Sequence, residues 1–474
     1  MPSKRYRLTL TVEGLVHIGD GGKYGKKDYF LTKQKTIAIL NAPSFVSKLD
    51  RDQLDDYCEF LKKDSRTGLQ EYLRRKGLDA VARGARLYTL DARQDSYQYF
   101  DIWRFVKDAH GCPYVPGSSI KGMLRTAILI SLIARDREAY EKLYDRGEVL
   151  KKRQRTDGDI QRKAFWVGQL DRDGDSAVND VLRYLSVSDS DPLSVDDLVL
   201  AKKYDKFSQK DDGRRKRKPR KTSDKEAYYQ GNELNIYREC LRPGTTIRTT
   251  LTVDERIGQY FDGLRLDRDG LPKALLFSYE LYQKCFLSHF DIDGEATSTK
   301  KEASSDGTCR YVIQDGPFAG MRCRKRAVDG TGYCNTHKKY ATVGGAAGGS
   351  AQDPICYLGG GIDFNTKTIE NALFVDEGRR LDEVSHILFD QFPTKLDEQR
   401  HAALKAEVQR AGFRSRPMDS QYKRNGQLKK AKEDHRHWRD GALGVSPHTL
   451  KMGKVQDKMY PMGKCRARFE ELEN

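Results

Sequence analysis

The stretch from Pro113 to Ala127 constrains the fold of this chain more strongly than any other part. It reads Pro-Tyr-Val-Pro-Gly-Ser-Ser-Ile-Lys-Gly-Met-Leu-Arg-Thr-Ala, which predicts a short strand, a glycine turn and the start of a helix. Ser118 or Ser119 can cap that helix, because a hydroxyl oxygen accepts a hydrogen bond from a free N–H of the first turn. Apolar residues then recur at helical spacing, so the helix is expected to run towards Arg146.

The same junction has the features of an anion site. Lys121 and Arg125 lie four residues apart and share one face of the predicted helix. Gly117 and Gly122 allow another backbone to approach closely. Because a helix N-terminus also carries free N–H groups and a partial positive charge, the junction suits an RNA phosphate. The alternative is an ordinary strand-to-helix junction with solvated charges.

Length and charge limit the classes of protein that fit. The chain has 474 residues, which predicts two or more domains, and a net charge of +17, which favours an anionic partner such as nucleic acid. No apolar run is long enough to span a bilayer, so no membrane association is expected. The nine cysteines are an odd number and mostly scattered, which favours a reducing cytoplasm over a disulfide framework.

The N-terminal region begins with a strand followed by a glycine-rich loop. Arg5 to Val12 alternates polar and apolar residues, as a half-buried strand does. The loop from His17 to Gly25 carries Lys23, and both phosphate contact and a solvated loop stay open. His17 is a candidate general base for RNA cleavage, but no second catalytic partner can be identified. A structural or RNA-contacting histidine is therefore favoured.

The next segments alternate strand and helix. Thr36 to Leu40 predicts a strand, and helices are predicted from Pro43 to Leu49, Gln53 to Lys63 and Gly68 to Arg75. Their apolar residues are expected to point inward: Leu54, Tyr57, Leu61, Leu69, Tyr72 and Leu73. This rhythm predicts an α+β sandwich of the ferredoxin or RRM type. The aromatic RNP1 pattern of RRM domains is absent, so base stacking on a central sheet is not supported.

The middle of the chain holds further strands. Val181 to Val187 predicts one, and Ser188 to Asp191 after it fits turn chemistry better than a paired-carboxylate metal site. Leu234 to Arg238 and Thr246 to Val253 predict two strands joined by a turn at Pro243-Gly244. The strongly basic stretch between the two groups, Lys202 to Glu226, is either an arm on an RNA backbone or a solvated loop.

One group of residues has the spacing of a metal site. Cys309, Cys323, Cys334 and His337 follow the pattern Cys-x13-Cys-x10-Cys-x2-His. Three thiolates and one imidazole close a tetrahedral zinc site and leave no open position for catalysis. Structural zinc is therefore predicted, with four unrelated residues in a loop as the alternative. Gly344 to Ser350 has the composition of a flexible linker.

Four motifs carry a resemblance to a known family. Pro116-Gly-Ser-Ser-Ile-Lys-Gly-x-x-Arg-Thr126 resembles the signature of the CRISPR-associated RAMP proteins. Its form is most similar to the subunit-five family of the type III-A Csm effector complex. Leu15 to Asp20, Tyr237 to Thr245 and the glycine-rich Tyr357 to Thr368 fit the same family and occur in the expected order.

The resemblance implies an α+β chain of two ferredoxin-like or RRM-like RAMP domains with a small zinc-binding insertion. Residues 1–200 would form the N-terminal RAMP-type domain, and residues 201–230 a basic flexible loop. The C-terminal RAMP-type domain would begin at residues 231–291 and continue at 351–474. The zinc-binding insertion and its linker, residues 292–350, would interrupt it.

The resemblance also implies a function. A protein of this family is expected to be a non-catalytic subunit that binds crRNA near its 3′ portion, stacks on the repeated backbone subunit and supports guide maturation and antiviral defence. Its partners would be crRNA, other Csm subunits and a host nuclease, and its cofactor structural zinc. RNA contacts are expected from ten residues: His17, Lys23, Ser118, Ser119, Lys121, Arg125, Gly359, Gly360, Gly361 and Lys367.

Three other functions stay open on the sequence. One is a metal-independent RAMP endoribonuclease that uses His17. Another is the repeated backbone subunit, which cuts target RNA with an acidic residue. The third is a zinc-containing DNA-binding protein with no role in CRISPR systems.

Overall fold

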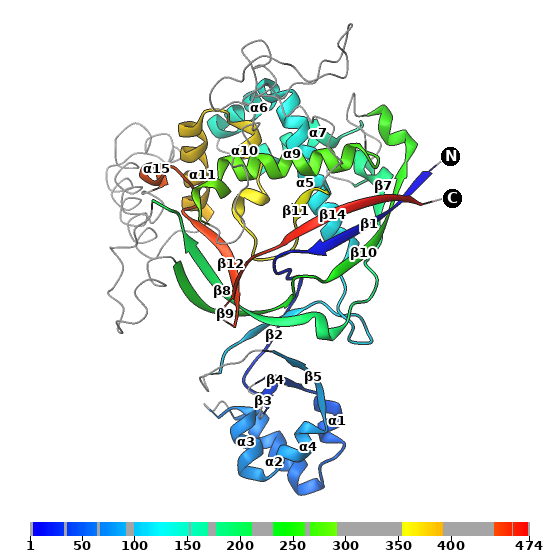
Figure 1. The fold of residues 1–474 in the computed structure, drawn as a ribbon, viewed down its shortest axis with the longest axis vertical. Helices are drawn as coiled ribbons and strands as arrows, with labels where there is room; N and C mark the ends of the chain where they lie inside the picture. The colour runs from blue at the N-terminus through cyan, green and yellow to red at the C-terminus, as the bar shows by residue number, and fades with distance from the viewer. Residues whose placement is uncertain are drawn as a thin grey trace, which may run out of the picture. The chain divides into compact units, whose positions relative to one another are not determined.

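A computed structural model describes residues 3–32, 36–63, 67–91, 99–150, 153–168, 177–210, 231–260, 266–291, 353–391, 440–456 and 458–472. Contacts divide the chain into two units, residues 1–290 with 354–474 and residues 291–353. All helices and strands below belong to the first unit. They confirm a mixed α+β protein (Figure 1).

A five-stranded antiparallel sheet lies at the centre of this unit (Figure 1). Its order is β11-β14-β1-β10-β7. The strands are β1 (Ser3–Val12), β7 (Leu185–Val187), β10 (Thr246–Asp254), β11 (Ile355–Tyr357) and β14 (Lys464–Leu472). The predicted first strand is confirmed: Tyr6, Leu8, Leu10 and Val12 are buried, while the residues between them are at least partly exposed.

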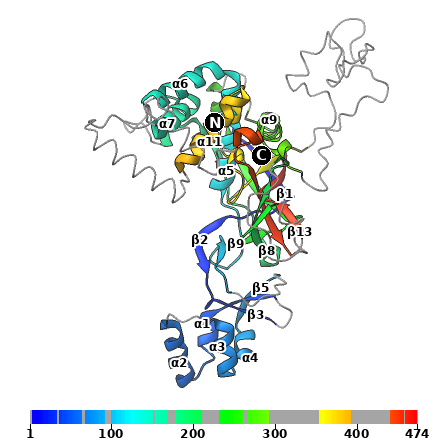
Figure 2. The ribbon, with the colours of Figure 1, turned by 90° about the vertical axis from the view of Figure 1, so that its left-hand side faces the viewer.

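Two long helices pack on this sheet. They are α5 (Gly117–Arg135) and α9 (Gly270–Cys285), and both contribute to the core that contains β1. With β11 set aside, the strands of this sheet and the two helices follow one another along the chain as β1, α5, β7, β10, α9 and β14. This is a β-α-β-β-α-β series. In the sheet these four strands stand in the order fourth, first, third, second. The helices α6 (Arg137–Leu150), α7 (Arg153–Phe165) and α11 (Glu377–Gln391) lie farther from the sheet (Figures 1 and 2). The short helix α10 (Glu370–Leu373) packs on α5 and α9.

The N-terminus of α5 differs from the prediction in two ways. The residue before the helix is Pro116, so Ser118 and Ser119 lie inside the first turn and cap nothing. Capping comes instead from Asp189, whose Oδ1 accepts a hydrogen bond from the Gly117 N–H at 2.7 Å. The expected strand before the helix is reduced to one isolated bridge at Pro113.

The C-terminal end of α5 also differs. The helix ends at Arg135, and Asp136 leaves the helical backbone conformation (φ −127°, ψ 48°) before α6 begins. The single helix expected to continue towards Arg146 is therefore wrong. By length and composition, α5 is the one helix of the described residues that could cross a membrane. Ile120, Leu124 and Ile128 are at most 1% exposed, however, so its apolar face is packed in the core.

A six-stranded sheet has the order β13-β12-β8-β9-β6-β2. Its strands are β2 (Gly19–Tyr24), β6 (Ile102–Phe105), β8 (Leu198–Phe207), β9 (Gly231–Leu241), β12 (Thr449–Val455) and β13 (Lys458–Pro461). The pair β6 and β9 is parallel, and the other pairs with an assigned register are antiparallel. The predicted loop from His17 to Gly25 is wrong, because β2 pairs with β6 and its glycines are accommodated by an irregularity between Gly19 and Lys23.

The two strands predicted on either side of the Pro243-Gly244 turn are confirmed as β9 and β10. Both strands exist and Gly244 has a positive φ of +91°, as a tight turn requires. However, β9 pairs with β8 and β6, whereas β10 pairs with β1 and β7, so the turn passes the chain from one sheet to the other. The expected boundary at residue 200 falls inside β8 and does not separate the sheets.

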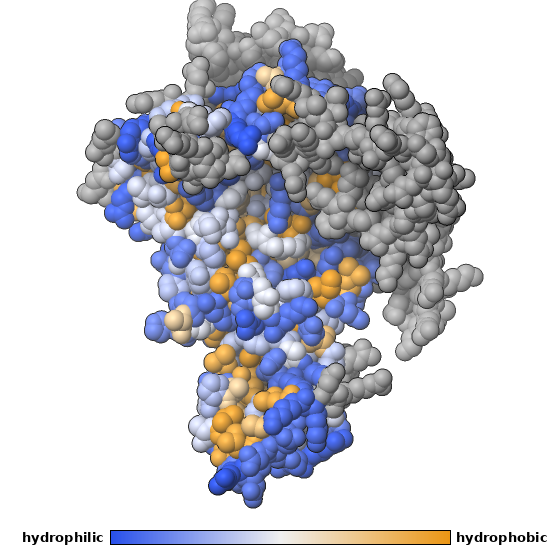
Figure 3. Space-filling model, turned by 180° about the vertical axis from the view of Figure 1, so that it is seen from behind, coloured by the Kyte–Doolittle hydropathy of each residue, from blue (hydrophilic) through white to orange (hydrophobic). Residues whose placement is uncertain are grey.

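A small lobe contains a three-stranded sheet, β3-β4-β5. It comprises β3 (Tyr29–Leu31), β4 (Ile37–Leu40), β5 (Arg86–Leu90), α1 (Ala42–Val46), α2 (Arg51–Lys62), α3 (Leu69–Lys76) and α4 (Asp79–Arg83). Phe45, Tyr57 and Tyr72 are buried in its core. Leu61, expected inside, is 43% exposed, and its neighbour Phe60 faces inward instead. The face in Figure 3 is mostly hydrophilic, with hydrophobic side chains gathered in patches that include this lobe.

The other described elements of the unit are short. They are η1 (Ala177–Asn179), η2 (Val181–Tyr184), η3 (Val195–Asp197), η5 (Glu255–Gln259), η6 (Leu287–His289), η8 (Phe364–Thr366) and α15 (Asp440–Leu443). The strand predicted from Val181 to Val187 is therefore η2 followed by β7. Ser188 to Asp191 has the predicted structural role, since it holds the start of α5 in place: Ser190 exchanges hydrogen bonds with the backbone of Val115.

Candidate functional site

Three of the four family-like motifs meet at the segment from Leu15 to Gly19. Val16 and Leu241 exchange backbone hydrogen bonds of 3.3 and 2.7 Å, which joins this segment to the motif at the end of β9. Gly360 donates a 2.7 Å hydrogen bond to the carbonyl oxygen of His17, which joins it to the glycine-rich loop. The segment is thus the point where parts of the chain more than 200 residues apart come together.

Gly359 is required by this junction. Its φ is +94°, and a Cβ at this position would lie 2.4 Å from the His17 carbonyl oxygen. Any side chain would therefore clash with the backbone it packs on. The glycine run thus serves contacts within the chain, and the Gly360 N–H is already engaged by His17.

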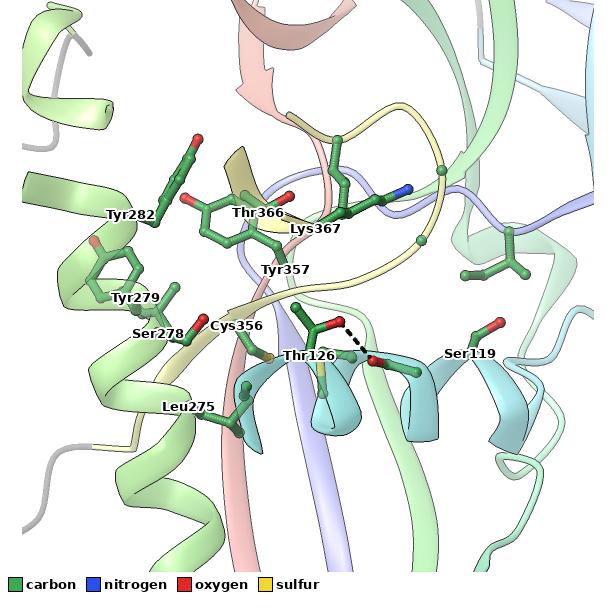
Figure 4. A pocket seen from close by; sticks show the side chains of 18 of the residues that line it. Ser119, Thr126, Leu275, Ser278, Tyr279, Tyr282, Cys356, Tyr357, Thr366 and Lys367 are labelled. Carbon is green, nitrogen blue, oxygen red and sulfur yellow. Dashed lines mark hydrogen bonds between the residues drawn. The ribbon is translucent and has the colours of Figure 1, made fainter. Parts of the chain in front are cut away.

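The fourth motif, Pro116 to Thr126, faces the segment from Leu15 to Gly19 across a cavity of about 450 Å³. The cavity lies between α5, α9, β11 and the glycine-rich loop (Figure 4). Four of the ten predicted RNA-contacting residues line it: Ser119, Gly359, Gly360 and Lys367. Its inner surface is largely apolar and includes Met123, Leu275 and Cys356.

Polar groups stand among these apolar side chains. Ser119 and Thr126 come from α5, Ser278 from α9, and Lys367 from the end of the glycine-rich motif (Figure 4). Lys367 is exposed, yet the protein around its ammonium displaces enough water to lower its pKa. The cavity can therefore offer hydroxyl groups and one cation to a ligand.

A buried carboxylate supports the wall of this cavity. Asp363 is 1% exposed. Its carboxyl accepts a 2.9 Å hydrogen bond from the Tyr282 hydroxyl and a 2.8 Å hydrogen bond from the Lys451 N–H. Burial raises the pKa of Asp363 to about 7, despite these two donors. The sequence does not predict Asp363 or Tyr282 at this site, because nothing in Gly-Ile-Asp-Phe distinguishes a buried carboxylate from a turn residue.

Lys121 and Arg125 lie on a different face of α5 from the cavity. Arg125 Nη1 lies 2.5 Å from Asp180 Oδ2, and its Nε donates to Gln161 Oε1 at 3.0 Å. Its guanidinium also stacks 4.1 Å from the ring centre of Phe165. Arg125 therefore joins α5 to α7. Lys121 is half-buried, and burial lowers its pKa.

The helix N-terminus proposed as an anion site is occupied within the protein. The Asp189 carboxylate already accepts the Gly117 N–H. Gly117 itself packs against β7, where a Cβ would lie 2.2 Å from the Val187 carbonyl oxygen. The glycine is thus needed for helix–sheet packing. Gly122 has open space around it and lines the cavity.

His17 is placed as a structural residue would be. It is 6% exposed, and its Nδ1 lies 2.7 Å from the Glu239 carbonyl oxygen, which can only accept. Burial lowers the pKa of His17 to about 4, so the ring is neutral near pH 7. The Glu239 carboxylate is itself buried and accepts hydrogen bonds from Tyr88, Phe105 and Lys107.

The remaining predicted residues lie elsewhere. Lys23, on β2, is 4.3 Å from the ring centre of Trp103 and 3.4 Å from Asp101. It is not among the residues that line the cavity. The predicted zinc ligands Cys309, Cys323, Cys334 and His337 are outside the described residues. Within the described part of the chain, no group of three or more His, Cys, Asp or Glu could hold a metal ion.

The chain is similar in sequence to several curated proteins. It is 32% identical over 169 residues to the CRISPR system Cms protein Csm5 of Mycobacterium tuberculosis strain CDC 1551, which covers 32% of this chain and 36% of that protein. The match thus spans about a third of the length of the mycobacterial protein. Identity to the Csm5 protein of Streptococcus thermophilus is 26% over 305 residues, covering 61% of this chain and 74% of that protein.

A solved structure shares the fold. One chain of the cryo-EM structure of a Csm-crRNA-target RNA ternary complex in a type III-A CRISPR-Cas system superposes with a TM-score of 0.54 at 17% identity. The superposition covers 98% of this chain and all of that chain. In addition, the RAMP superfamily model matches residues 9–302, more than half of the sequence. Because this match covers more than half of the sequence and the family-like motifs meet at one site, we conclude that the chain belongs to the RAMP superfamily.

Proposed function

We propose that this protein is a non-catalytic, crRNA-binding subunit of a type III-A Csm effector complex. The observation that carries the proposal is the cavity at which Ser119, Gly359, Gly360 and Lys367 meet, from two family-like motifs more than 200 residues apart. The proteins it is similar to are named Csm5, and the solved chain that shares its fold comes from a complex that contains crRNA.

In this proposal the rim of the cavity holds the RNA backbone. Lys367 supplies the positive charge and Ser119 a hydroxyl donor for a phosphate oxygen. Such contacts set position and affinity, while base pairing of the guide reads the target sequence. The net charge of +17 supports the same kind of ligand. Lys121 and Lys23 would add contacts outside the cavity, whereas the partners of Arg125 favour a structural role for it.

The proposal also gives the subunit a position in the complex and a role in the cell. The subunit would cap the repeated backbone subunit near the 3′ portion of the crRNA and support guide maturation and antiviral defence in the cytoplasm. Its partners would be crRNA and the other Csm subunits, together with a host nuclease. The β-α-β-β-α-β series around β1 supports one ferredoxin-like RAMP unit, and the six-stranded sheet would belong to the second.

The proposal assigns no catalysis to His17. A general base must reach the proton that it removes, and this ring is buried with its Nδ1 bound to a backbone carbonyl. This placement supports a positioning role, because the His17 carbonyl also anchors Gly360. It disfavours the alternative of a RAMP endoribonuclease that depends on this histidine.

We also propose that Cys309, Cys323, Cys334 and His337 hold one structural zinc ion in the insertion. This proposal rests on their spacing and ligand types. Metal analysis of the purified chain should find about one zinc per molecule, and Cys334→Ser should remove most of it. A zinc-free, fully folded protein would overturn the assignment.

The RNA-binding proposal is tested by the salt dependence of affinity. Lys367→Ala should weaken binding of a short repeat-derived RNA and lower the slope of log K against log salt by about one. Lys62→Ala is the matched control, because Lys62 lies on the lobe beside Glu59 and should leave both quantities unchanged. Equal affinity and slope in wild type and Lys367→Ala, or failure of the chain to bind such RNA, would overturn the proposal.

A further inference from the structure

The interior of the cavity is larger and more apolar than phosphate binding requires. Its volume of about 450 Å³ lies within the range of sites for small organic ligands, roughly 300–1,000 Å³. Met123 and Ala127 of α5 and Leu275 of α9 form part of the inner surface, while Ser119 and Lys367 supply polar groups. This division suits a ligand with an apolar body and a negatively charged group.

One wall of the cavity is aromatic. The rings of Tyr279 and Tyr357 are 6.5 Å apart at their centres and inclined by 27°, and Tyr282 meets Tyr357 edge-on at 4.9 Å (Figure 4). The hydroxyl of Tyr282 is held by the buried Asp363. Because this anchor fixes one ring of the cluster, the wall is preorganised to receive a flat ligand.

Hydroxyl groups lie within the same space. Ser278 on α9 and Thr126 on α5 both line the cavity, and Thr126 donates to the Gly122 carbonyl oxygen at 3.1 Å, which leaves its lone pairs for a donor. A flat body with polar edges and an adjoining phosphate describes a nucleotide. A single aromatic side chain from a protein partner would fill the apolar interior but would not use the cation at Lys367.

We infer that the cavity binds one unstacked nucleobase of the guide RNA, with the adjoining phosphate at Lys367 and Ser119. This inference rests on the proposed function and makes it more specific. It adds base stacking on an aromatic wall to the backbone contacts. Removal of a single base from the RNA should then weaken binding at only one position of the strand.

Gly122 offers a way to fill the cavity without damage to the fold. It lines the cavity, and a Cβ at this position would meet no atom within 4 Å. Gly122→Leu therefore adds bulk in open space and improves helix propensity in α5. Gly258→Leu is the matched control, because Gly258 also has open space and does not line the cavity.

The test is abasic scanning of a repeat-derived RNA against the full-length protein. For wild type and Gly258→Leu, one abasic position should weaken binding about tenfold, the size expected for one stacked base. Gly122→Leu should bind intact RNA about tenfold more weakly and lose sensitivity to that abasic position. Its salt slope should stay that of wild type, because Lys367 is unchanged.

Three outcomes would overturn the inference alone. One is RNA that binds with a Lys367-dependent salt slope but has no sensitive base position. Another is a sensitive position that persists in Gly122→Leu. The third is a photo-crosslinker at residue 122 that captures a protein subunit in place of RNA in the assembled complex. Failure to bind RNA at all, by contrast, would overturn the proposed function itself.

Discussion

Gly359 lets the glycine-rich loop pass directly over the backbone of His17. A Cβ there would approach the His17 carbonyl oxygen to 2.4 Å, and the φ of +94° is unfavourable for any other residue. The sequence predicts an RNA contact at this glycine, and that role stays a prediction. The contact that the structure adds is internal, between loops 342 residues apart in sequence, and no local pattern could reveal it.

Replacement of this glycine should therefore destabilise the protein. Gly359→Ala should lower the free energy of unfolding by at least about 1 kcal/mol more than Gly111→Ala does, because backbone atoms must move as well. Gly111 has a similar φ of +82° with no atom near its Cβ position, so its replacement measures conformational strain alone, about 1–2 kcal/mol. Urea unfolding compares the two, and equal losses would show that the His17 contact is not tight.

Asp363 should make stability depend on pH. Its pKa is about 7 in the folded protein against an ordinary 3.8, so between these values the unfolded carboxyl ionises while the folded one keeps its proton. Stability then falls as pH rises through this window. Over the whole window the loss amounts to about 4 kcal/mol. Asp363→Asn removes this titration and can still accept from the Lys451 N–H.

The difference in unfolding free energy between Asp363→Asn and wild type should rise by about 4 kcal/mol, in favour of the variant, from pH 4 to pH 8. His17 acts in the opposite direction: its folded pKa of about 4 is below its ordinary 6.5, so it adds stability as pH rises. Because both proteins contain His17, its effect cancels in the difference. A difference that is constant with pH would contradict the prediction.

At the scale of elements, helix α5 divides the predicted RNA-contacting residues between two faces. Ser119 faces the cavity together with Gly122, Met123 and Thr126, whereas Arg125 is bound to α7 and Asp180. The 3.6-residue period of the helix does group Lys121 with Arg125, as expected. It does not tell which face meets a partner helix, since that depends on where α7 returns.

Arg125 should therefore matter more for stability than Lys121. Arg125→Ala leaves the half-exposed Asp180 without its ion pair and removes the stacking on Phe165, at a cost of about 1–2 kcal/mol after screening by solvent. Lys121→Ala should change the unfolding free energy by less than about 0.5 kcal/mol. Urea unfolding distinguishes them, and equal small effects would show that the Asp180 pair contributes little.

At the scale of the whole molecule, strands from distant parts of the chain share one sheet. β1, near the N-terminus, lies between β10 and β14, and β8 lies between β9 and β12. The division into residues 1–200 and 231–474 therefore cuts through both large sheets. Contacts place all of these residues except 291–353 in a single unit.

Outside the small lobe, a fragment of residues 1–200 should not fold by itself. It would leave β1 without β10 and β14 on either side, which exposes unpaired backbone and an apolar face. Circular dichroism during urea titration should show no cooperative transition beyond that of the small lobe, whose core lies wholly within the fragment. As a control, a chain with 292–352 replaced by a short Gly-Ser linker should retain one, because those residues belong to the other unit. A cooperative transition larger than that of the small lobe alone would contradict this sheet topology.

The sequence by itself determined the features that depend on near neighbours. The alternation in β1, the start of α1 with its proline, the helices α2 and α3 and the ordered family motifs all follow from residues a few positions apart. The tertiary structure alone decided which sheet takes β10, that the glycine-rich segment after His17 becomes β2, and that Asp189 caps α5. Those outcomes depend on contacts between segments tens to hundreds of residues apart, where burial and backbone pairing outweigh local propensity.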